Sequence, residues 1–247
     1  MNIIDKLLTI NKYSRTGERQ NKIEYIVVHW VGNANTSATA NRNYFNNLSK
    51  THKTYASSHY IIGLDGEIIR CIPDDEVAFH SGSYGMNRKS IGIENCHPDW
   101  NGKFNDKTYN ALVELCAELC KKYGIDIHNV IRHYDVTGKV CPKYYVEHSN
   151  EWNKFKADVY NKIKGTPNVP KKQEGSEEKP MYTFKNGKTI EWIYADSNHT
   201  KKIGYLNKWE SCECYGIING APMVKYRVGN TNNFKVGFAK DVRCVVK

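Results

Sequence analysis

The sequence has no long hydrophobic run and no recognisable export signal. No window approaches the roughly 18 consecutive apolar residues that a transmembrane helix requires. The N-terminal segment carries Asp5 and Lys6 and lacks an apolar stretch of signal-peptide length. We therefore expect a protein that is made in the cytoplasm without a signal peptide and that does not insert into a membrane.

Cysteine is too sparse for a small disulfide-stabilised scaffold. The 247 residues include 8 cysteines, and no Cys-x-x-Cys pair occurs among them. Cys116 and Cys120 are four residues apart on a predicted helix, and Cys212 and Cys214 are two apart on a predicted strand, so each pair shares one face. We interpret all four as packing residues rather than metal or redox sites.

Acidic residues are in the minority, and the formal net charge is +10. Residues 181–247 contain 11 basic and 5 acidic side chains, so much of this excess lies in the C-terminal quarter. A basic module favours an anionic partner such as nucleic acid, an acidic membrane or an anionic cell-wall polymer. The sequence has no zinc-finger spacing, no RNP-like aromatic motif and no dense Lys/Arg run, which argues against nucleic acid.

Hydrophobic residues make up 40% of the chain and charged residues 25%, which is ordinary for a protein with a real core. Three of the seven prolines fall in GTPNVPKKQEGSEEKP, together with Gly, Ser and charges of both signs. This composition is typical of a linker. The sequence therefore predicts three parts, which are a domain over 1–164, a linker over 165–180 and a smaller domain over 181–247.

Strand and helix patterns alternate in the first part. Ser37 is a suitable N-cap for the first predicted helix, and Asp106 and Gly124 are suitable start and stop signals for the second. The interleaving indicates an α/β domain with a mixed central sheet flanked by helices. The predicted strands are 23–31, two around an Asp65-Gly66 turn within 57–73, 90–96 and 129–135; the predicted helices are 37–50, 107–123 and 148–163.

The second part has a different pattern. Short apolar runs such as TIEWIYAD and MVKYRVG alternate with Asn-Gly and Gly-Asn pairs, and no helical period is evident. Aromatic residues are frequent among them. The pattern predicts a small β-barrel or β-sandwich.

Two stretches place chemically active side chains beside apolar runs. VVHW puts His29 near the end of a strand that reads as buried, and IRHYDVTGKVCP carries His133 and, eight residues later, Cys141. A polar group at the end of a buried strand needs a partner, because burying it unpaired costs about 1–3 kcal/mol. A single histidine of this kind is more often a hydrogen-bonded core residue, so neither stretch alone identifies a site.

Four segments together resemble a known family. VVHW, SSHYIIGLDGEIIRCIPDDEVAFHSG, SIGIEN and IRHYDVTGKVCP are similar, in order and approximate spacing, to the zinc-dependent N-acetylmuramoyl-L-alanine amidases shared by phage endolysins, bacterial amidases and peptidoglycan recognition proteins. The resemblance covers roughly residues 20–160. It implies the mixed α/β fold of that family.

The resemblance also implies a site. His29, His133 and Cys141 would be the three protein ligands of one catalytic Zn²⁺, and such a set leaves the fourth position open for water. Glu94, in SIGIEN, would be the general base, and a carboxylate on an apolar strand suits a base with a raised pKa. Lys139 would stabilise the tetrahedral intermediate. The alternatives are a surface Glu94 and a solvated loop Lys139.

Other positions are less defined by the resemblance. His80, in AFHSG, matches a position in the family's substrate groove, and the alternatives are a contact with substrate, support of the metal ligands, or a loop histidine bonded to backbone. One phage branch has a catalytic Tyr where this chain has Ser58, so we carry no such Tyr over. We expect His59 to be structural and Asp74 and Asp75 to be turn residues. The remaining histidines are expected at the surface or at helix caps, namely His52, His97, His128, His148 and His199.

The expected function follows from these assignments. The chain resembles a peptidoglycan hydrolase that cleaves the amide between the lactyl group of N-acetylmuramic acid and L-alanine with a zinc-activated water, most simply an endolysin released through a holin. Residues 181–247 resemble bacterial SH3-like wall-binding domains, which would bind peptidoglycan or anionic wall polymers. We expect a monomer. A host autolysin and a non-hydrolytic peptidoglycan-binding module are the alternatives, and the second normally lacks a zinc ligand.

Overall fold

The chain forms two compact units in a computed structural model, and the boundary between them falls at residues 168 and 169. The predicted linker lies outside the described residues. Among the described residues, no helix is long and apolar enough to cross a membrane. The structure describes residues 2–164, 182–197, 199–218, 221–227, 234–240 and 244–246.

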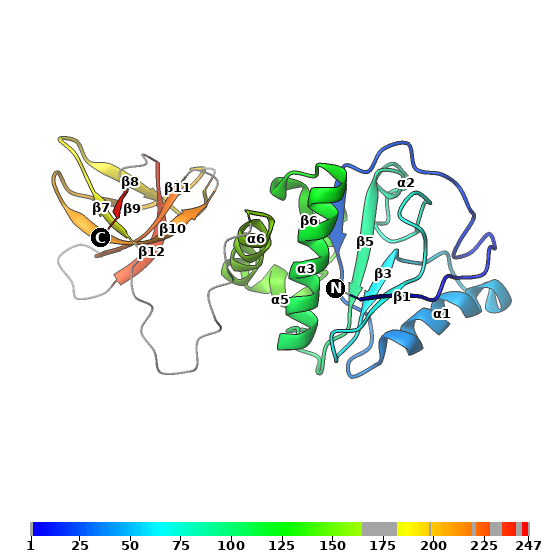
Figure 1. Cartoon of the computed structure of the whole chain (residues 1–247). Helices are drawn as coiled ribbons and strands as arrows, with labels where there is room; N and C mark the ends of the chain where they lie inside the picture. The colour runs from blue at the N-terminus through cyan, green and yellow to red at the C-terminus, as the bar shows by residue number, and fades with distance from the viewer. Residues whose placement is uncertain are drawn as a thin grey trace. The chain divides into compact units, whose positions relative to one another are not determined.

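A six-stranded mixed sheet forms the centre of the first unit (Figure 1). Its strand order is β1-β4-β3-β5-β2-β6. The hairpin β3–β4 is antiparallel, and the other neighbouring pairs are parallel. The strands are β1 (Ile3–Asp5), β2 (Tyr25–Val28), β3 (Tyr60–Ile62), β4 (Ile68–Arg70), β5 (Ser90–Asn95) and β6 (Val130–Arg132).

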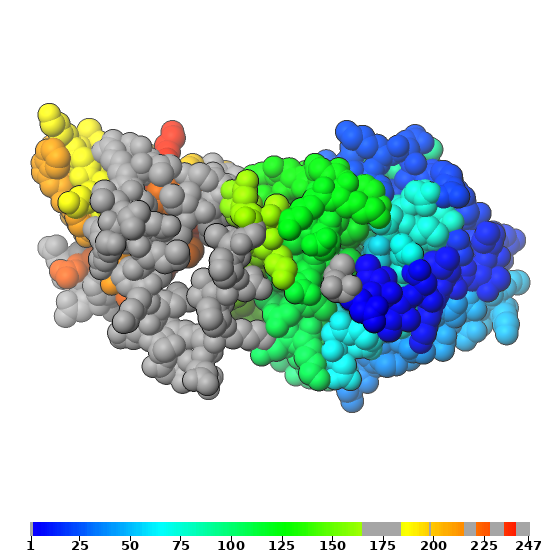
Figure 2. Space-filling view, in the orientation of Figure 1, coloured from blue at the N-terminus to red at the C-terminus, as the bar shows by residue number. Residues whose placement is uncertain are grey.

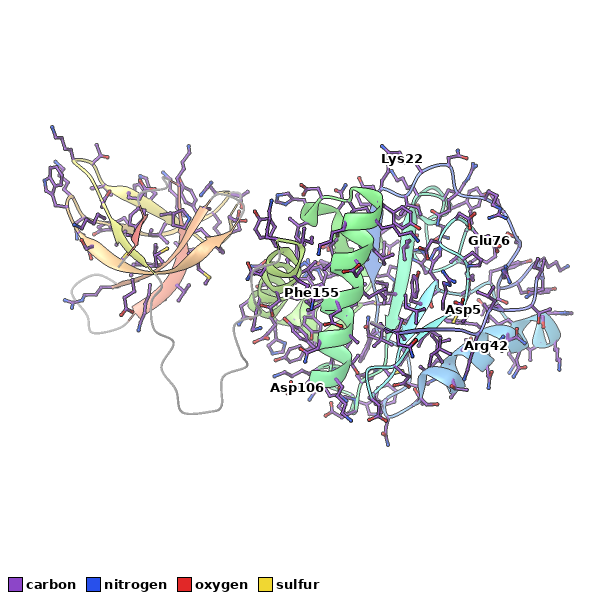
Figure 3. The ribbon with its side chains drawn as sticks, viewed as in Figure 1. Asp5, Lys22, Arg42, Glu76, Asp106 and Phe155 are labelled. Carbon is purple, nitrogen blue, oxygen red and sulfur yellow. The ribbon has the colours of Figure 1, made fainter. Side chains whose placement is uncertain are left out.

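Helices cover both faces of this sheet, because alternate strand residues are apolar toward each side. α3 and α6 pack on one face, where Phe155 of α6 is almost completely buried and points toward α3 (Figures 1 and 3). The outer side of α3 forms part of the surface of this unit (Figure 2). α1 packs on the opposite face through Phe45 and Leu48. The helices are α1 (Ala38–Thr51), α2 (Tyr84–Asn87), α3 (Asp106–Tyr123), the 3-10 helix η1 (Ile127–Asn129), α4 (His133–Thr137), α5 (Lys143–Glu147) and α6 (Ser149–Lys164).

The predicted helix boundaries are largely confirmed. Ser37 is the N-cap of α1, and Gly124 ends α3 with a φ of 65°. The predicted cap of α3 is wrong by one residue, because Asn105 is the N-cap and accepts a hydrogen bond from the Thr108 N–H. Asp106 instead occupies the first turn, at the start of α3 (Figure 3), where its charge favours the helix dipole.

The predicted hairpin at Asp65-Gly66 is confirmed, whereas the predicted strand 129–135 is only partly correct. β6 ends at Arg132, and His133 begins the short helix α4. The Asp135 carboxylate accepts the backbone N–H of Arg132 at 2.8 Å and so caps the first turn of that helix. The chain therefore changes direction at His133.

The second unit contains a seven-stranded antiparallel sheet in the described residues, which agrees with the predicted all-β pattern. Cys214 is in its core and Cys212 packs against that core, while Cys116 and Cys120 are buried in the first unit, so the packing interpretation of all four is confirmed. The strands are β7 (Tyr182–Lys185), β8 (Glu191–Tyr194), β9 (Lys202–Leu206), β10 (Ser211–Ile218), β11 (Ala221–Arg227), β12 (Phe234–Ala239) and β13 (Cys244–Val246).

Candidate metal centre

Three neighbouring parallel strands bring three polar residues to one side of the sheet, at or near their carboxyl ends. The last residue of β2 is in register with Ile93 of β5 and with Arg132 of β6. The residues that follow are His29, Glu94 and His133. Because the carboxyl ends of parallel strands share one edge, side chains placed there converge on a common site.

Cys141 reaches this edge through a short loop. α4 ends at Gly138, which adopts a left-handed conformation with a φ of 78° and allows the chain to reverse. The Tyr134 N–H then donates to the Cys141 carbonyl at 3.0 Å. The loop is thereby closed beside His133. The Trp30 N–H also donates a hydrogen bond to the Cys141 thiol.

His29, His133 and Cys141 form one buried group, which we call the metal group. Its donor atoms all lie within 4.8 Å of one another. Nδ1 of His29 is 3.1 Å from Nδ1 of His133 and 3.7 Å from Sγ of Cys141. The exposed fractions are 1%, 6% and 2%, so bulk water does not separate the three donors. The structure thus brings together all three residues predicted as metal ligands.

The electrostatics of this group suit a cation. Burial lowers the pKa of His29 well below its ordinary value and lowers the pKa of His133 to about 4, so both rings are neutral at pH 7 and can offer a lone pair. Burial raises the pKa of Cys141 to about 12, so the thiol needs a positive charge beside it to lose its proton. Two neutral imidazoles and a thiol that a cation deprotonates match the donors that zinc takes in proteins.

Glu94 lies on β5, where its charge acts on Cys141, and the residue as a whole is half-buried. Burial raises its pKa to about 8, against the opposing effect of the Lys139 charge. Its Oε2 is buried and has no hydrogen-bond partner among the described residues. A buried carboxylate oxygen without a partner has unused capacity to accept a proton. Lys139 is exposed, and its charge acts on Glu94 and on the three predicted ligands.

His80 is buried and lies directly behind the metal group. Its Nδ1 is 3.1 Å from Nε2 of His29, and the two rings meet edge to face. The geometry thus places it against a predicted ligand. Its contact with substrate, and the catalytic roles of Glu94 and Lys139, stay predictions.

The other singled-out histidines have mixed outcomes. His59 is fully buried, with Nδ1 accepting the Gly92 N–H at 3.0 Å and Nε2 at 2.9 Å from the Glu76 carbonyl, as expected of a structural residue. The expectation that His97 lies at the surface is wrong. It is completely buried, its ring stacks on Trp30, and Nε2 lies 2.8 Å from the Val31 carbonyl.

Asp74 and Asp75 do lie in a turn, as predicted, but they differ in burial. Asp74 is 5% exposed and accepts hydrogen bonds from Tyr60, Tyr123 and Lys122. Asp75 is exposed. Ser58 is buried, and its hydroxyl donates to the Tyr60 carbonyl at 2.9 Å.

The sequence reasoning missed several polar residues behind the metal group. Ser81, Asn87 and Ser90 are all at least nine-tenths buried. They lie in or near AFHSG and SIGIEN, two segments that the sequence had already singled out. Hydroxyl and amide side chains carry no sequence signal for such a role, since they are also common in ordinary loops.

Comparisons with known proteins identify the family of this chain. Residues 19–144, half of the chain, match the N-acetylmuramoyl-L-alanine amidase family. A probable N-acetylmuramoyl-L-alanine amidase of Bacillus licheniformis is 34% identical over 167 residues, which cover 64% of this chain and 47% of the relative. The N-acetylmuramoyl-L-alanine amidase BlyA of Bacillus subtilis (strain 168) is 29% identical over 261 residues, covering 94% of this chain and 68% of BlyA. The chain spans about half the length of the first of these relatives.

A solved structure supports the same assignment. A mutant endolysin from Bacillus subtilis is 31% identical and superposes with a TM-score of 0.55, covering 64% of this chain and 98% of the endolysin. The matched family region includes His29, Glu94, His133 and Cys141. The fold, the buried His/His/Cys group and these matches lead to one conclusion: the chain belongs to the N-acetylmuramoyl-L-alanine amidase family.

Proposed function

We propose that this chain hydrolyses bacterial peptidoglycan at the amide between the lactyl group of N-acetylmuramic acid and L-alanine. One observation carries the proposal. The His29–His133–Cys141 group, which can hold a metal ion, lies beside the unpaired, buried carboxylate oxygen of Glu94. A metal site together with a proton acceptor is the arrangement that amide hydrolysis requires.

The metal ion is proposed to be Zn²⁺, held by His29, His133 and Cys141. When bound, it supplies Lewis acidity that polarises an amide carbonyl and increases the acidity of water. Glu94 accepts the proton of the attacking water, and its raised pKa allows it to hold that proton and then return it to the departing amine. Lys139 contributes positive charge where the carbonyl oxygen becomes negative.

The second unit is proposed to bind the cell wall as an SH3-like module. Trp192 on β8 and Tyr205 on β9 pair across the two strands, are about half exposed, and meet edge to face with ring centroids 6.0 Å apart. Lys202 Nζ lies 4.2 Å from the centroid of the Trp192 ring. Exposed aromatic rings stack on sugars, and the basic charge of residues 181–247 attracts anionic wall polymers.

The proposed site of action is the wall, which this protein would reach from the host cytoplasm after holin-dependent release. A tethered wall-binding unit would raise the local concentration of the catalytic unit at its substrate. A host autolysin would perform the same chemistry. The arrangement of the site is the same whether a phage or the host bacterium encodes the protein.

A digest of purified Gram-positive peptidoglycan tests the chemistry. We expect mass spectrometry to detect intact stem peptides with free N-terminal alanine, and we expect a chelator to abolish their release and added Zn²⁺ to restore it. Wall binding by the zinc-loaded protein without peptide release would instead indicate a recognition module. New reducing sugar ends would show that a different bond is cleaved.

A further inference from the structure

A chain of buried hydrogen bonds continues behind the metal group. Nε2 of His29 faces Nδ1 of His80 at 3.1 Å, and Nε2 of His80 lies 3.2 Å from Oγ of Ser90. Ser90 Oγ is in turn 2.7 Å from the Met86 carbonyl oxygen. His29, His80 and Ser90 are 1%, 8% and 0% exposed, so water does not compete for these bonds.

The direction of each hydrogen bond follows from the last acceptor in this series. The Met86 carbonyl can only accept, so the Ser90 hydroxyl donates to it and accepts from His80. The Ser90 carbonyl also accepts a hydrogen bond from the His80 ring. Nε2 of His80 therefore carries the ring hydrogen. A neutral imidazole carries one ring hydrogen, so with that hydrogen on Nε2 the Nδ1 of His80 is an acceptor.

The tautomer of His29 is the consequence. An acceptor at His80 Nδ1 requires a hydrogen on His29 Nε2, because the two nitrogens are 3.1 Å apart and one of them has to donate. The other nitrogen of His29, Nδ1, then keeps its lone pair. This is the atom that faces His133 and Cys141.

His133, the second histidine of the metal group, is held in a similar way by Ser81, the residue that follows His80. The Ser81 carbonyl forms a hydrogen bond with the His133 ring. Nε2 is the ring nitrogen near Gly82, whereas Nδ1 lies 3.1 Å from Nδ1 of His29. The carbonyl thus accepts from Nε2–H of His133. Two Nδ1 lone pairs that face each other at this distance repel unless a cation lies between them.

Buried contacts hold the His80–Ser81 segment in place. Asn87 Oδ1 accepts from the Ser81 N–H at 2.9 Å, from the Ser81 hydroxyl at 2.8 Å and from the His80 N–H at 3.3 Å. The His80 ring packs on the backbone of Gly92, where a Cβ atom would lie 2.4 Å from it. Any side chain at this glycine would therefore displace the ring.

We propose that His80 and the Ser81 carbonyl are positioning groups that set the tautomers of His29 and His133, so that both rings present Nδ1 to the metal ion. The inference rests on the proposed function, because it concerns how this chain holds its metal. Groups that orient metal-bound imidazoles in this way typically change metal affinity 10- to 100-fold.

The tautomers are measured first in the metal-free, full-length protein. Long-range ¹H–¹⁵N correlation spectra of histidine-labelled protein should show His29 and His80 each with the hydrogen on Nε2. His133 should show it on Nε2 once Zn²⁺ is added and the repulsion between the two Nδ1 lone pairs is relieved. The assignment uses the spectra of single-residue variants. A hydrogen on Nδ1 of His29 in the wild-type protein would overturn the proposal, whatever the enzyme's activity.

Zn²⁺ affinity, measured by competition with a chromophoric chelator, is the second readout. His80→Phe keeps a ring but removes the acceptor, and should weaken Zn²⁺ binding 10- to 100-fold. His80→Asn returns an acceptor oxygen near the place of Nδ1 and should recover most of the affinity. Thr108→Val is the matched control, because it removes a buried hydroxyl that donates to the Gly63 carbonyl at 2.8 Å, outside the metal group.

The outcomes separate the two proposals. If wild-type protein binds no Zn²⁺, the proposed metal function fails, while the tautomer measurement still judges the positioning of the rings. If wild-type protein binds Zn²⁺ and the Zn²⁺ affinity of His80→Phe is within twofold of the wild-type value, the proposed role of His80 is wrong. Circular dichroism of both His80 variants checks that each is folded.

Discussion

Glu94 shows how the surroundings of one residue determine its chemistry. Surface carboxylates of the first unit such as Asp5 and Asp65 pair with arginine or lysine, and these partners lower their pKa values. Glu94 instead lies on an apolar strand, and burial raises its pKa to about 8. A carboxylate with this pKa exchanges protons near neutral pH, which is the property that a general base and acid needs.

Replacement of Glu94 by glutamine tests this role. Glu94→Gln preserves the size of the side chain but removes its proton acceptor, so we expect peptidoglycan cleavage to slow by about 10²- to 10⁴-fold. The bound zinc, measured by metal analysis, should stay equimolar with the protein. Glu114→Gln is a suitable control, because that carboxylate pairs with Lys162 away from the site. Cleavage by Glu94→Gln within tenfold of the wild-type rate would contradict the role.

The role of a single residue is predictable where a motif combines several residue types at a fixed spacing. The resemblance that the motifs around His29 and His133 carry correctly implied which side chains meet. His97 was assigned wrongly because its burial depends on Trp30 and on the Val31 carbonyl, which the sequence around it does not specify. A single histidine in a polar segment looks like a surface residue unless its tertiary partners are known.

At the level of elements, Asp74 connects three parts of the first unit. It follows β4 and accepts hydrogen bonds from Tyr60 on β3 and from Lys122 and Tyr123 at the end of α3. Burial by itself would raise the pKa of Asp74, but these hydrogen bonds outweigh it and lower the pKa below its ordinary value. The ionised form is therefore favoured in the folded protein.

This shift makes stability dependent on pH in a defined direction. A carboxylate with a lowered pKa in the folded state stabilises the protein above its unfolded pKa, and the contribution disappears as pH falls through the folded pKa. We expect Asp74→Asn to reduce the free energy of unfolding by about 2 kcal/mol at pH 7. The difference from the wild type should shrink below about pH 4, as measured by urea denaturation.

The neighbouring aspartate provides the control for this prediction. Asp75 pairs with Arg19, and both side chains are about two-thirds exposed. Asp75→Asn should therefore change the free energy of unfolding by less than about 0.5 kcal/mol at either pH. Equal effects of the two substitutions would show that the buried network around Asp74 does not stabilise the fold.

At the level of the whole molecule, the two units differ in ways that suit different tasks. The first unit contains the buried metal group, whereas residues 181–247 carry a larger share of the positive charge and the exposed pair Trp192 and Tyr205. Catalysis and wall attachment are accordingly expected to respond to different substitutions.

Trp192→Ala tests whether the second unit contributes to wall binding but not to catalysis. Loss of the exposed ring should weaken cosedimentation with purified cell walls by about tenfold, within the ~0.5–1.5 kcal/mol that an aromatic contact contributes. The rate on small soluble muropeptides should be unchanged. Trp209→Ala removes a more exposed indole and is the matched control. We expect Trp209→Ala to bind walls as the wild type does. If Trp192→Ala also binds walls as the wild type does, the Trp192–Tyr205 pair is not the attachment surface.

The sequence by itself determined the alternation of elements and the all-β character of the second unit, and its resemblance to the amidase family indicated the residues of the metal group. Those features depend on local periodicity and on motifs whose members keep a fixed spacing. The tertiary structure alone decided that His80 lies behind His29, that Asn87 holds the His80–Ser81 segment and that Asp74 is buried. These arrangements arise from contacts between segments far apart in the chain, where burial and hydrogen-bond direction, rather than local pattern, determine what each side chain can do.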